Sequence, residues 1–300
     1  MSDSGVDALR RFRNEGGFFR LDARACFRLS GQDRVRYLNG QVSNDVRKLI
    51  PGVAMQACVL SAKGKLDAVI WMWCEADAIV VECAWEAAEH LGMRLEKYIV
   101  ADDVTVESLE AADEIHVFGP AADALPDAQV LRRLARLGVP GADISATAAQ
   151  DLPVECAEES KELLRIENAI PKWGAELSAD TLPAEAGLDA AAVDFHKGCY
   201  IGQEVASRIR SVGHANRSLQ RFLASGNTVL EPGTELFPPG EFDGRPAGVV
   251  TSSAYHFGLS RGVGLCYIRR GVGPEAVLET APSPGAATIK ICPFLPCELS

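Results

Sequence analysis

Residues 196–205 read His-Lys-Gly-Cys-Tyr-Ile-Gly-Gln-Glu-Val, and this stretch decides how the rest of the chain is interpreted. Between residues 196 and 221 there are five Lys or Arg residues and one acid, although the 300-residue chain carries a formal net charge of −11. The local positive charge predicts either an anion site or a basic helix face in contact with water. Val205 and Ile209 stand four apart and predict a short helix over 200–209.

Cys199 would stand at the N-terminus of that helix, where free backbone N–H groups and the helix dipole favour negative charge. Lys197 is two residues away. Such surroundings lower cysteine pKa values to about 3.5–7.5. Cys199 is therefore a candidate nucleophile, redox thiol or metal ligand. The alternative is a small buried apolar side chain, which is the usual environment of a free cysteine.

The other cysteines predict no metal site. The chain has nine cysteines and no C-x-x-C motif, so we expect reduced thiols rather than disulfides or a zinc ribbon. Cys292 and Cys297 are separated by four residues, two of them prolines, and the sequence leaves their role open.

Composition narrows the class of protein. Hydrophobic residues make up 47% and charged residues 24%, an ordinary globular balance. The longest apolar run is seven residues, Ala68–Cys74, whereas a membrane-spanning helix needs about 20. The N-terminal residues are polar and show no secretory signal. We therefore expect a cytoplasmic protein without membrane contact, and the acidic balance argues against specific nucleic-acid binding.

Hydrophobic patterning predicts an α+β fold with two regions. Residues 1–218 alternate strands and helices, with an uncertain division into two subdomains. Residues 219–300 carry short β-type runs between frequent Gly and Pro, which is typical of a small antiparallel barrel. The stretch 171–187 inside the first region is irregular, and a stretch of that length is often functional.

Individual elements follow from the same patterning. We expect strands at Gln56–Leu60, Ala68–Cys74, Ile79–Ala84, Thr105–Leu109, Ile115–Phe118, Arg221–Ala224, Ala247–Thr251, Val263–Arg269 and Ala287–Ile291. We expect helices at Glu86–Tyr98, Ala128–Leu137 and Ser160–Asn168.

Residues 197–204, Lys-Gly-Cys-Tyr-Ile-Gly-Gln-Glu, resemble the K-G-C-[YF]-x-G-Q-E signature of the YgfZ family of folate-binding proteins. That family supports iron–sulfur enzymes and is related to the T-protein (aminomethyltransferase) of the glycine cleavage system. Four further parts of the chain also resemble this family: Tyr37–Val46, Arg165–Glu167 with Pro171–Leu177, Gly248–Ser252 and Gly262–Tyr267. The resemblance is weakest around residues 75–150.

The resemblance implies a T-protein-like α+β fold with a C-terminal barrel, arranged as a ring around a central channel. It implies that tetrahydrofolate or a one-carbon derivative binds in that channel, and that iron–sulfur client or assembly proteins are partners. Cys199 would lie near the folate. There it would supply a thiolate that contacts a cluster, a persulfide or a folate-bound one-carbon adduct.

Specific residues take roles under this resemblance. A carboxylate suits the amino group and N–H of a pterin, and the basic cluster of Lys197, Arg208, Arg210 and Arg217 suits the anionic glutamate tail. The candidate folate-binding residues are Glu167, Glu176, Asp67, Trp173, Tyr200 and Arg208. Cys199 and Lys197 are the candidate chemical residues, and Gly198, Gly202, Gln203 and Glu204 complete the motif.

The sequence leaves open whether the protein is an enzyme. One alternative is a folate-dependent aminomethyl- or methyltransferase. Against it, the second of two aspartates that the T-protein carries near Asp67 is Ala68 here, so a possible acid–base group is lost. The other alternative is a non-catalytic scaffold with a structural folate.

Overall fold

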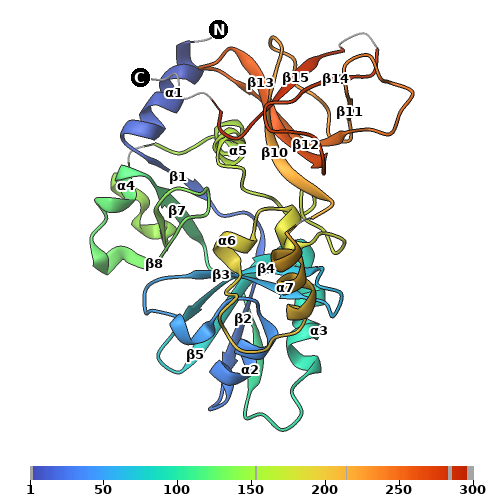
Figure 1. Cartoon of the computed structure of the whole chain (residues 1–300). Helices are drawn as coiled ribbons and strands as arrows, with labels where there is room; N and C mark the ends of the chain where they lie inside the picture. Colours follow the sequence, from blue (N-terminus) through green and yellow to red (C-terminus); the bar gives the residue numbers. More distant parts are fainter. Residues whose placement is uncertain (1–2, 153, 214, 283–285, 296–300) are drawn as a thin grey trace.

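The computed structural model describes residues 3–152, 154–213, 215–282 and 286–295. Three bodies surround a common centre (Figure 1): a barrel at the upper right, a four-stranded sheet at the left and a five-stranded sheet below. Every pairing between the named strands is antiparallel. The expected α+β class is therefore confirmed.

The five-stranded sheet has the strand order β3-β4-β5-β2-β6. Its strands are β2 (Arg24–Ser30), β3 (Met55–Leu60), β4 (Leu66–Cys74), β5 (Ala78–Ala84) and β6 (Thr105–Leu109). Helices α2 (Arg34–Gln41) and α3 (Ala88–Lys97) supply apolar side chains to the largest core cluster, together with residues of β2–β5. Fully burying one such aliphatic side chain contributes about 1.5–3 kcal/mol to the free energy of folding. The packing of α2 and α3 on the sheet therefore stabilises the five-stranded body.

The four-stranded sheet has the order β1-β7-β9-β8. Its strands are β1 (Gly17–Arg20), β7 (Glu114–Phe118), β8 (Val130–Leu134) and β9 (Gly141–Ser145). Helices α1 (Asp3–Asn14) and α4 (Pro120–Asp123) lie beside it (Figure 1). Phe12 of α1 packs against Phe118 of β7, which joins α1 to the sheet.

The barrel closes in the order β10-β13-β12-β11-β14-β15. Its strands are β10 (Arg217–Ala224), β11 (Glu235–Phe237), β12 (Gly248–His256), β13 (Arg261–Arg269), β14 (Val277–Thr280) and β15 (Thr288–Cys292). The four barrel strands that the sequence predicts are present, so the expected C-terminal antiparallel barrel is confirmed.

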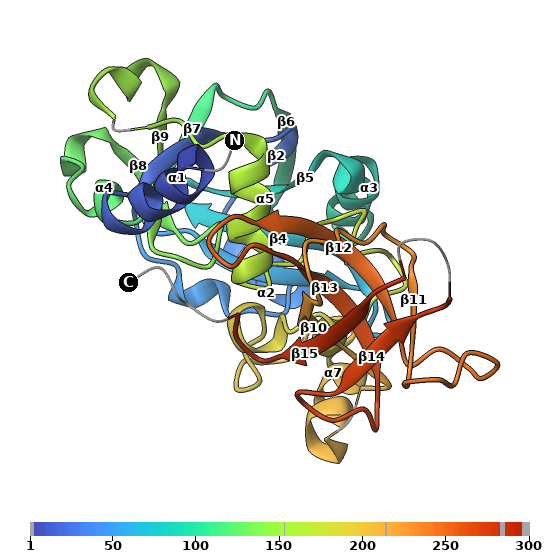
Figure 2. The same ribbon diagram turned by 90° about the horizontal axis from the view of Figure 1, so that it is seen from above.

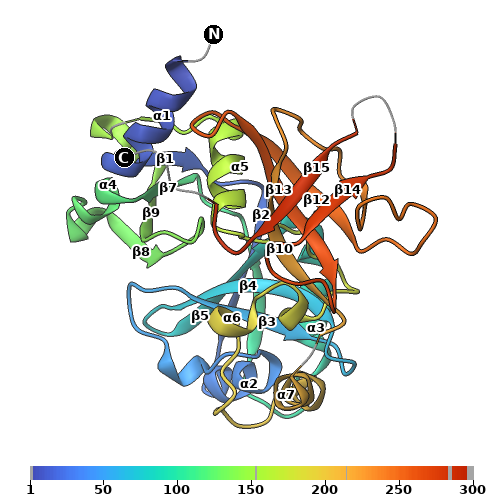
Figure 3. The same cartoon turned by 45° about the horizontal axis from the view of Figure 1, so that its top comes forward.

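Three further helices lie outside the sheets and the barrel. They are α5 (Glu158–Glu167), α6 (Asp189–Ala192) and α7 (Gln203–Val212). Seen from above, α5 lies between α1 and the barrel strand β12 (Figure 2). With the molecule tilted forward, α6 and α7 lie beside β3 and the five-stranded sheet (Figure 3).

One predicted helix is wrong. Residues 128–137 form the short turn Asp127–Gln129 and then strand β8. The leucines there have helical spacing, but in the structure Leu131 is 48% exposed whereas Arg132 is only 4% exposed. Arg132 forms ion pairs with Glu114 of β7 and Asp143 of β9. These long-range charge pairs override the local helical pattern.

The remaining predicted elements occur with small shifts at their ends. The expected helix Glu86–Tyr98 is a 3-10 turn, Trp85–Ala87, followed by α3, and the expected helix Ser160–Asn168 is α5. No helix among the described residues combines the length and apolar character needed to cross a bilayer.

Candidate functional site

Residues 196–205 form a loop that leads into α7 beside the β3–β4 hairpin. The helix begins at Gln203, so the predicted start at residue 200 is wrong, and Cys199 lies in the loop before the helix rather than in its first turn. Gly202 caps the helix with a φ of +85°, and a Cβ there would lie 2.6 Å from the carbonyl oxygen of Ser61. Glycine is therefore required at this turn. The backbone of Gly198 does not take a positive φ, and a Cβ there would meet no atom within 4 Å.

The Lys197 side chain fixes the loop to a distant part of the chain. Its Nζ donates hydrogen bonds to the carbonyl oxygens of Asn39, Val42 and Asn44, each at 2.7 Å. Burial lowers the pKa of Lys197 to about 8. Because an ammonium group has three N–H donors, all of them are used by these carbonyls. Lys197 therefore connects residues 37–46 and 197–204, two of the stretches on which the family resemblance rests.

Cys199 is exposed, and it is the only exposed cysteine in the described part of the chain. The thiols of Cys26, Cys58, Cys83 and Cys156 are buried, and burial raises their pKa values to between about 11 and about 12. These thiols stay protonated and have little access to solvent. The alternative in which Cys199 is a buried apolar side chain is therefore wrong. Cys297 lies outside the described residues, and Cys292 is half-buried.

The rest of the motif divides into a buried and an exposed part. The Tyr200 ring packs in a core cluster with Cys58, Leu60 and Leu66. Burial raises the pKa of Tyr200 to about 12. Glu204 and Arg208 are exposed on α7. The motif therefore presents its sulfur and its charged helix face to solvent, while its aromatic ring anchors it.

A cavity of about 1300 Å³ lies where the bodies meet. Strands β3, β4 and β5 form one wall, the residues that follow β8 form another, and α5 with parts of 168–191 completes it. The irregular stretch predicted at 171–187 thus contributes to the cavity. Seven basic and five acidic side chains line it, the opposite balance to the acidic chain as a whole. This space suits a large ligand with an anionic group.

Trp173 is the one predicted folate-binding residue that lines the cavity. Glu167, Tyr200 and Arg208 are not among the lining residues, and neither are Glu176 and Asp67. The basic residues proposed for the glutamate tail, Lys197, Arg208, Arg210 and Arg217, do not line it either. Their assignment to folate stays a prediction that the cavity does not support.

Glu167 and Glu176 hold the bodies together. The Glu167 carboxylate lies 2.9 Å from Arg13 of α1 and 2.8 Å from His256 of the barrel. Glu176 is fully buried, and its carboxylate accepts hydrogen bonds from Arg165 at 2.9 Å and from Ser252 at 2.6 Å. The resemblance stretches 165–177 and 248–252 therefore meet at this carboxylate.

Asp67 faces away from the cavity because β4 carries a β-bulge. Val59 pairs with Ala68 and Leu60 pairs with Leu66, so Asp67 is the extra residue. Its carboxylate lies 3.2 Å from His90 and 3.5 Å from Arg94 of α3. The bulge turns the side chain toward α3.

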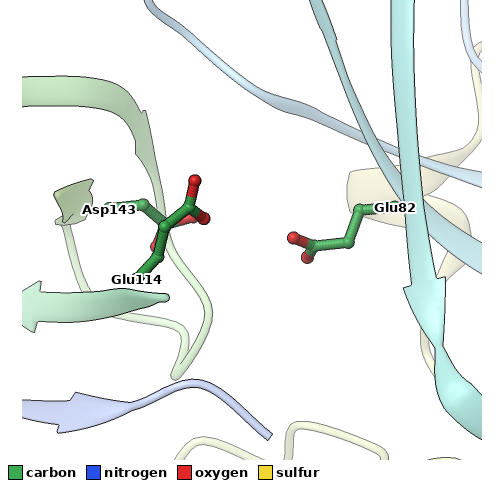
Figure 4. A group of neighbouring side chains, drawn as sticks. All are labelled: Glu82, Glu114 and Asp143. Atoms are coloured by element: carbon green, nitrogen blue, oxygen red, sulfur yellow. The ribbon is translucent and has the colours of Figure 1, made fainter. Parts of the chain in front are cut away.

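A buried ionic cluster joins the two open sheets next to the cavity. The carboxylates of Glu82, Glu114 and Asp143 point toward one another (Figure 4), with oxygen atoms within 4.8 Å of one another. Three arginines pair with them: Arg24 with Glu82 and Glu114, Arg132 with Glu114 and Asp143, and Arg136 with Glu82 and Asp143. The guanidinium groups supply the positive charge that a cation would bring. The cluster is therefore a joint between sheets.

Acid is expected to weaken this joint. Burial lowers the pKa of His116, which hydrogen bonds to Asp143 at 2.9 Å. Burial alone would raise the pKa of Asp143, but the hydrogen bond from His116 and the charge of Arg136 hold it well below its usual value. In both cases the unfolded chain binds more protons in acid. The free energy of unfolding should therefore decrease below about pH 6.5 for His116 and further below about pH 4 for Asp143.

Urea denaturation between about pH 8 and about pH 3 checks this expectation. An Asp143→Asn variant removes the carboxylate, so its free energy of unfolding should change less steeply with pH in the acidic range. A free energy of unfolding that stays constant down to about pH 4 would contradict the prediction.

Sequence reasoning missed the cavity wall. Gln56, Trp71 and Glu82 stand on neighbouring strands and all line the cavity. The available signal was Glu82 itself, an acid inside the apolar run Ile79–Ala84. A charged residue in a buried strand requires partners, and partners of that kind mark an interface or a site.

No protein-family profile matches the chain. It is 27% identical over 246 residues to the mitochondrial iron-sulfur cluster assembly factor IBA57 homolog of Phaeosphaeria nodorum, covering 74% of this chain and 59% of that protein. The chain thus spans less than two thirds of that relative. It is 26% identical over 243 residues to the tRNA-modifying protein YgfZ of Yersinia enterocolitica, covering 72% of this chain and 73% of that protein.

Among solved structures, the glycine cleavage system aminomethyltransferase T from Bartonella henselae superposes with a TM-score of 0.79. The alignment covers 93% of this chain and 86% of that protein at 18% identity. At that identity the likeness shows the fold alone. The expected T-protein-like fold with a C-terminal antiparallel barrel is confirmed.

Proposed function

Since the chain is a distant homologue of the IBA57 and YgfZ proteins, we propose that it binds a tetrahydrofolate and supports the assembly or repair of iron–sulfur clusters in client enzymes. Cys199 is the functional thiolate in this proposal. One relative is named for iron–sulfur cluster assembly and another for tRNA modification, and each matches more than two thirds of this chain.

The observation that carries the proposal is the exposure of Cys199. The loop around it is fixed from three sides, by Lys197 on residues 39–44, by Tyr200 in the core and by Gly202 against the hairpin. Exposed free cysteines are oxidised easily, so a surface sulfur on a rigid support suits a chemical role better than a packing role. Lys197 is a positioning residue here, because its N–H groups contact backbone carbonyls.

The cavity supports folate as the ligand. In the ring arrangement that we expect, this cavity is the central channel. A second hollow of about 570 Å³ shares Lys48 and Ala191 with it and reaches His196, three residues from Cys199. Lys172 is exposed at the cavity and suits the anionic tail of a folate.

The transferase alternative is less well supported. Ala68 is fully buried in the core below the sheet, so no side chain from that position reaches the cavity. Asp67 is already paired with α3. The scaffold alternative, in which folate is structural, differs in that it leaves Cys199 without a role. We keep the cytoplasm as the expected compartment and iron–sulfur client or assembly proteins as the expected partners.

Calorimetric titration of the wild-type chain with tetrahydrofolate tests the cofactor, and we expect saturable binding at one site. The same titration on Glu167→Ala tests the sequence-based assignment of that carboxylate. Loss of the heat in a variant that is still folded would support the assignment, and unchanged binding would remove it. A wild-type chain that gives no heat would remove folate from the proposal.

A further inference from the structure

The two open sheets have four edge strands, and other parts of the chain cover three of them. Residues 154–156 hydrogen bond to β1, residues 52–54 to β8 and residues 42–44 to β3. The barrel is closed and therefore has no edge strand. Strand β6 is the fourth edge and lies beside β2 (Figure 2). Within the residues that the structure describes, the backbone of β6 pairs only with β2.

The outer side of β6 offers unused backbone hydrogen-bonding groups. The strand is exposed at Thr105, Glu107 and Ser108. In an antiparallel ladder, successive residues direct their N–H and C=O groups to alternate sides, so two or three of the five residues direct theirs away from β2. Such an edge is a template on which an extended segment of another chain can add as a further strand.

The charge around β6 decides which kind of strand can add. Residues 101–113 contain five Asp or Glu residues and no Lys or Arg. Glu107, the central residue of β6, is 54% exposed and lies 3.7 Å from Arg28, which is shared with Glu75 and Asp77. If two copies of this chain paired through the centre of β6, Glu107 would stand opposite Glu107, and like charges in that position are destabilising. The edge therefore favours a basic segment over a second copy.

The side-chain alternation of β6 predicts the pattern of that segment. Val106 packs against the core cluster to which α2 and α3 contribute, and Glu107 projects from the opposite face of the sheet. Side chains of an added strand alternate in the same way. A basic residue opposite Glu107 would therefore have aliphatic neighbours on the face of Val106.

We propose that β6 is a docking edge for an extended segment of a partner protein in which Lys or Arg alternates with aliphatic residues. The segment adds to the five-stranded sheet as a sixth strand. Its backbone hydrogen bonds supply affinity, and Glu107 selects a basic side chain. This surface is separate from the proposed function, because it requires neither a folate nor Cys199.

Fluorescence anisotropy with a labelled peptide of alternating Lys and Val tests the edge, and we expect saturable binding to the wild-type chain. Glu107→Lys should weaken binding about 5-fold or more, since it replaces an attraction by a repulsion. Glu235→Lys is the matched control, because Glu235 is exposed on β11, which is paired on both sides in the barrel. Thermal melting shows that each variant is folded. A peptide of alternating Lys and Pro has the same charge but is unsuited to an added strand.

Hydrogen exchange and sedimentation locate the peptide. Binding at β6 should slow amide exchange in residues 104–110, and the wild-type chain should sediment as a monomer. The proposal is overturned if the Lys-Val peptide does not bind, if the Lys-Pro peptide binds equally well, or if Glu107→Lys binds like Glu235→Lys. A dimer in which residues 104–110 are already protected without peptide would also overturn it, and would assign the edge to a second copy of the chain.

Discussion

A Cys199→Ala variant is expected to restore no more iron–sulfur enzyme activity in a deletion strain than the strain shows without any added protein. The reason is that the proposed role needs a thiolate, and alanine supplies none. Cys199 is exposed, so its removal creates no cavity. The free energy of unfolding should therefore change by no more than about 0.5 kcal/mol, as for other surface substitutions. A loss of function would then be chemical rather than a loss of fold.

Two further variants make this test specific. Cys199→Ser keeps the size of the side chain but has no thiolate, so we expect the same loss. Cys74→Ala removes a half-buried cysteine at the end of β4 and should retain the wild-type activity. Full activity of the Cys199→Ala variant would eliminate the thiol role and would favour the scaffold alternative.

Glu176→Ala is expected to cost about 3–5 kcal/mol of unfolding free energy, because it removes a buried carboxylate that three donors share, and each donor left without an acceptor costs about 1–3 kcal/mol. Arg165 is the first of these donors and retains only its ion pair with Glu162. Ser252 and the backbone N–H of Lys172 lose an acceptor in the same step. Domains of this kind are stable by only about 5–15 kcal/mol, so the variant would lose a large part of its stability. Urea denaturation measures the change.

The control for this prediction is Asp180→Ala. Asp180 forms an exposed ion pair with Lys65, and such pairs contribute only about 0–1 kcal/mol. A Glu176→Ala variant as stable as Asp180→Ala would contradict the structural role. It would also return Glu176 to consideration as a carboxylate for the ligand. Binding data on Glu176 variants are therefore meaningful only beside a measurement of folding.

The elements that the sequence predicts best are those whose local pattern and tertiary environment agree. Strands β4 and β5 are apolar runs buried in the main core, and the expected strands Gln56–Leu60 and Ala68–Cys74 are present as β3 and β4, which pair with each other. Residues 128–137 show the opposite case, because buried ion pairs of Arg132 override a helical spacing of leucines. Charge partners more than ten residues away leave no local signal.

In the candidate site too, the sequence predicts what depends on a local motif and does not predict what depends on long-range contacts. The motif identified Cys199, and the structure shows that its sulfur is accessible. The motif could not show that Glu167 contacts α1 and the barrel, or that Glu176 contacts Arg165. These contacts depend on how the three bodies meet. Nor could it reveal that Gln56, Trp71 and Glu82 form one row, because strand register is set by pairing across the sheet.

The three carbonyls that hold Lys197 have a consequence for the order of folding. They belong to residues 39–44, more than 150 positions earlier in the chain. Contacts between such distant residues form late, because a long loop must close before they add stability. The loop at residues 196–202 is therefore expected to reach its final shape only after the N-terminal body has formed. A fragment that began after residue 44 would leave the Lys197 ammonium without these acceptors, so the region around the sulfur cannot acquire this shape independently of the beginning of the chain.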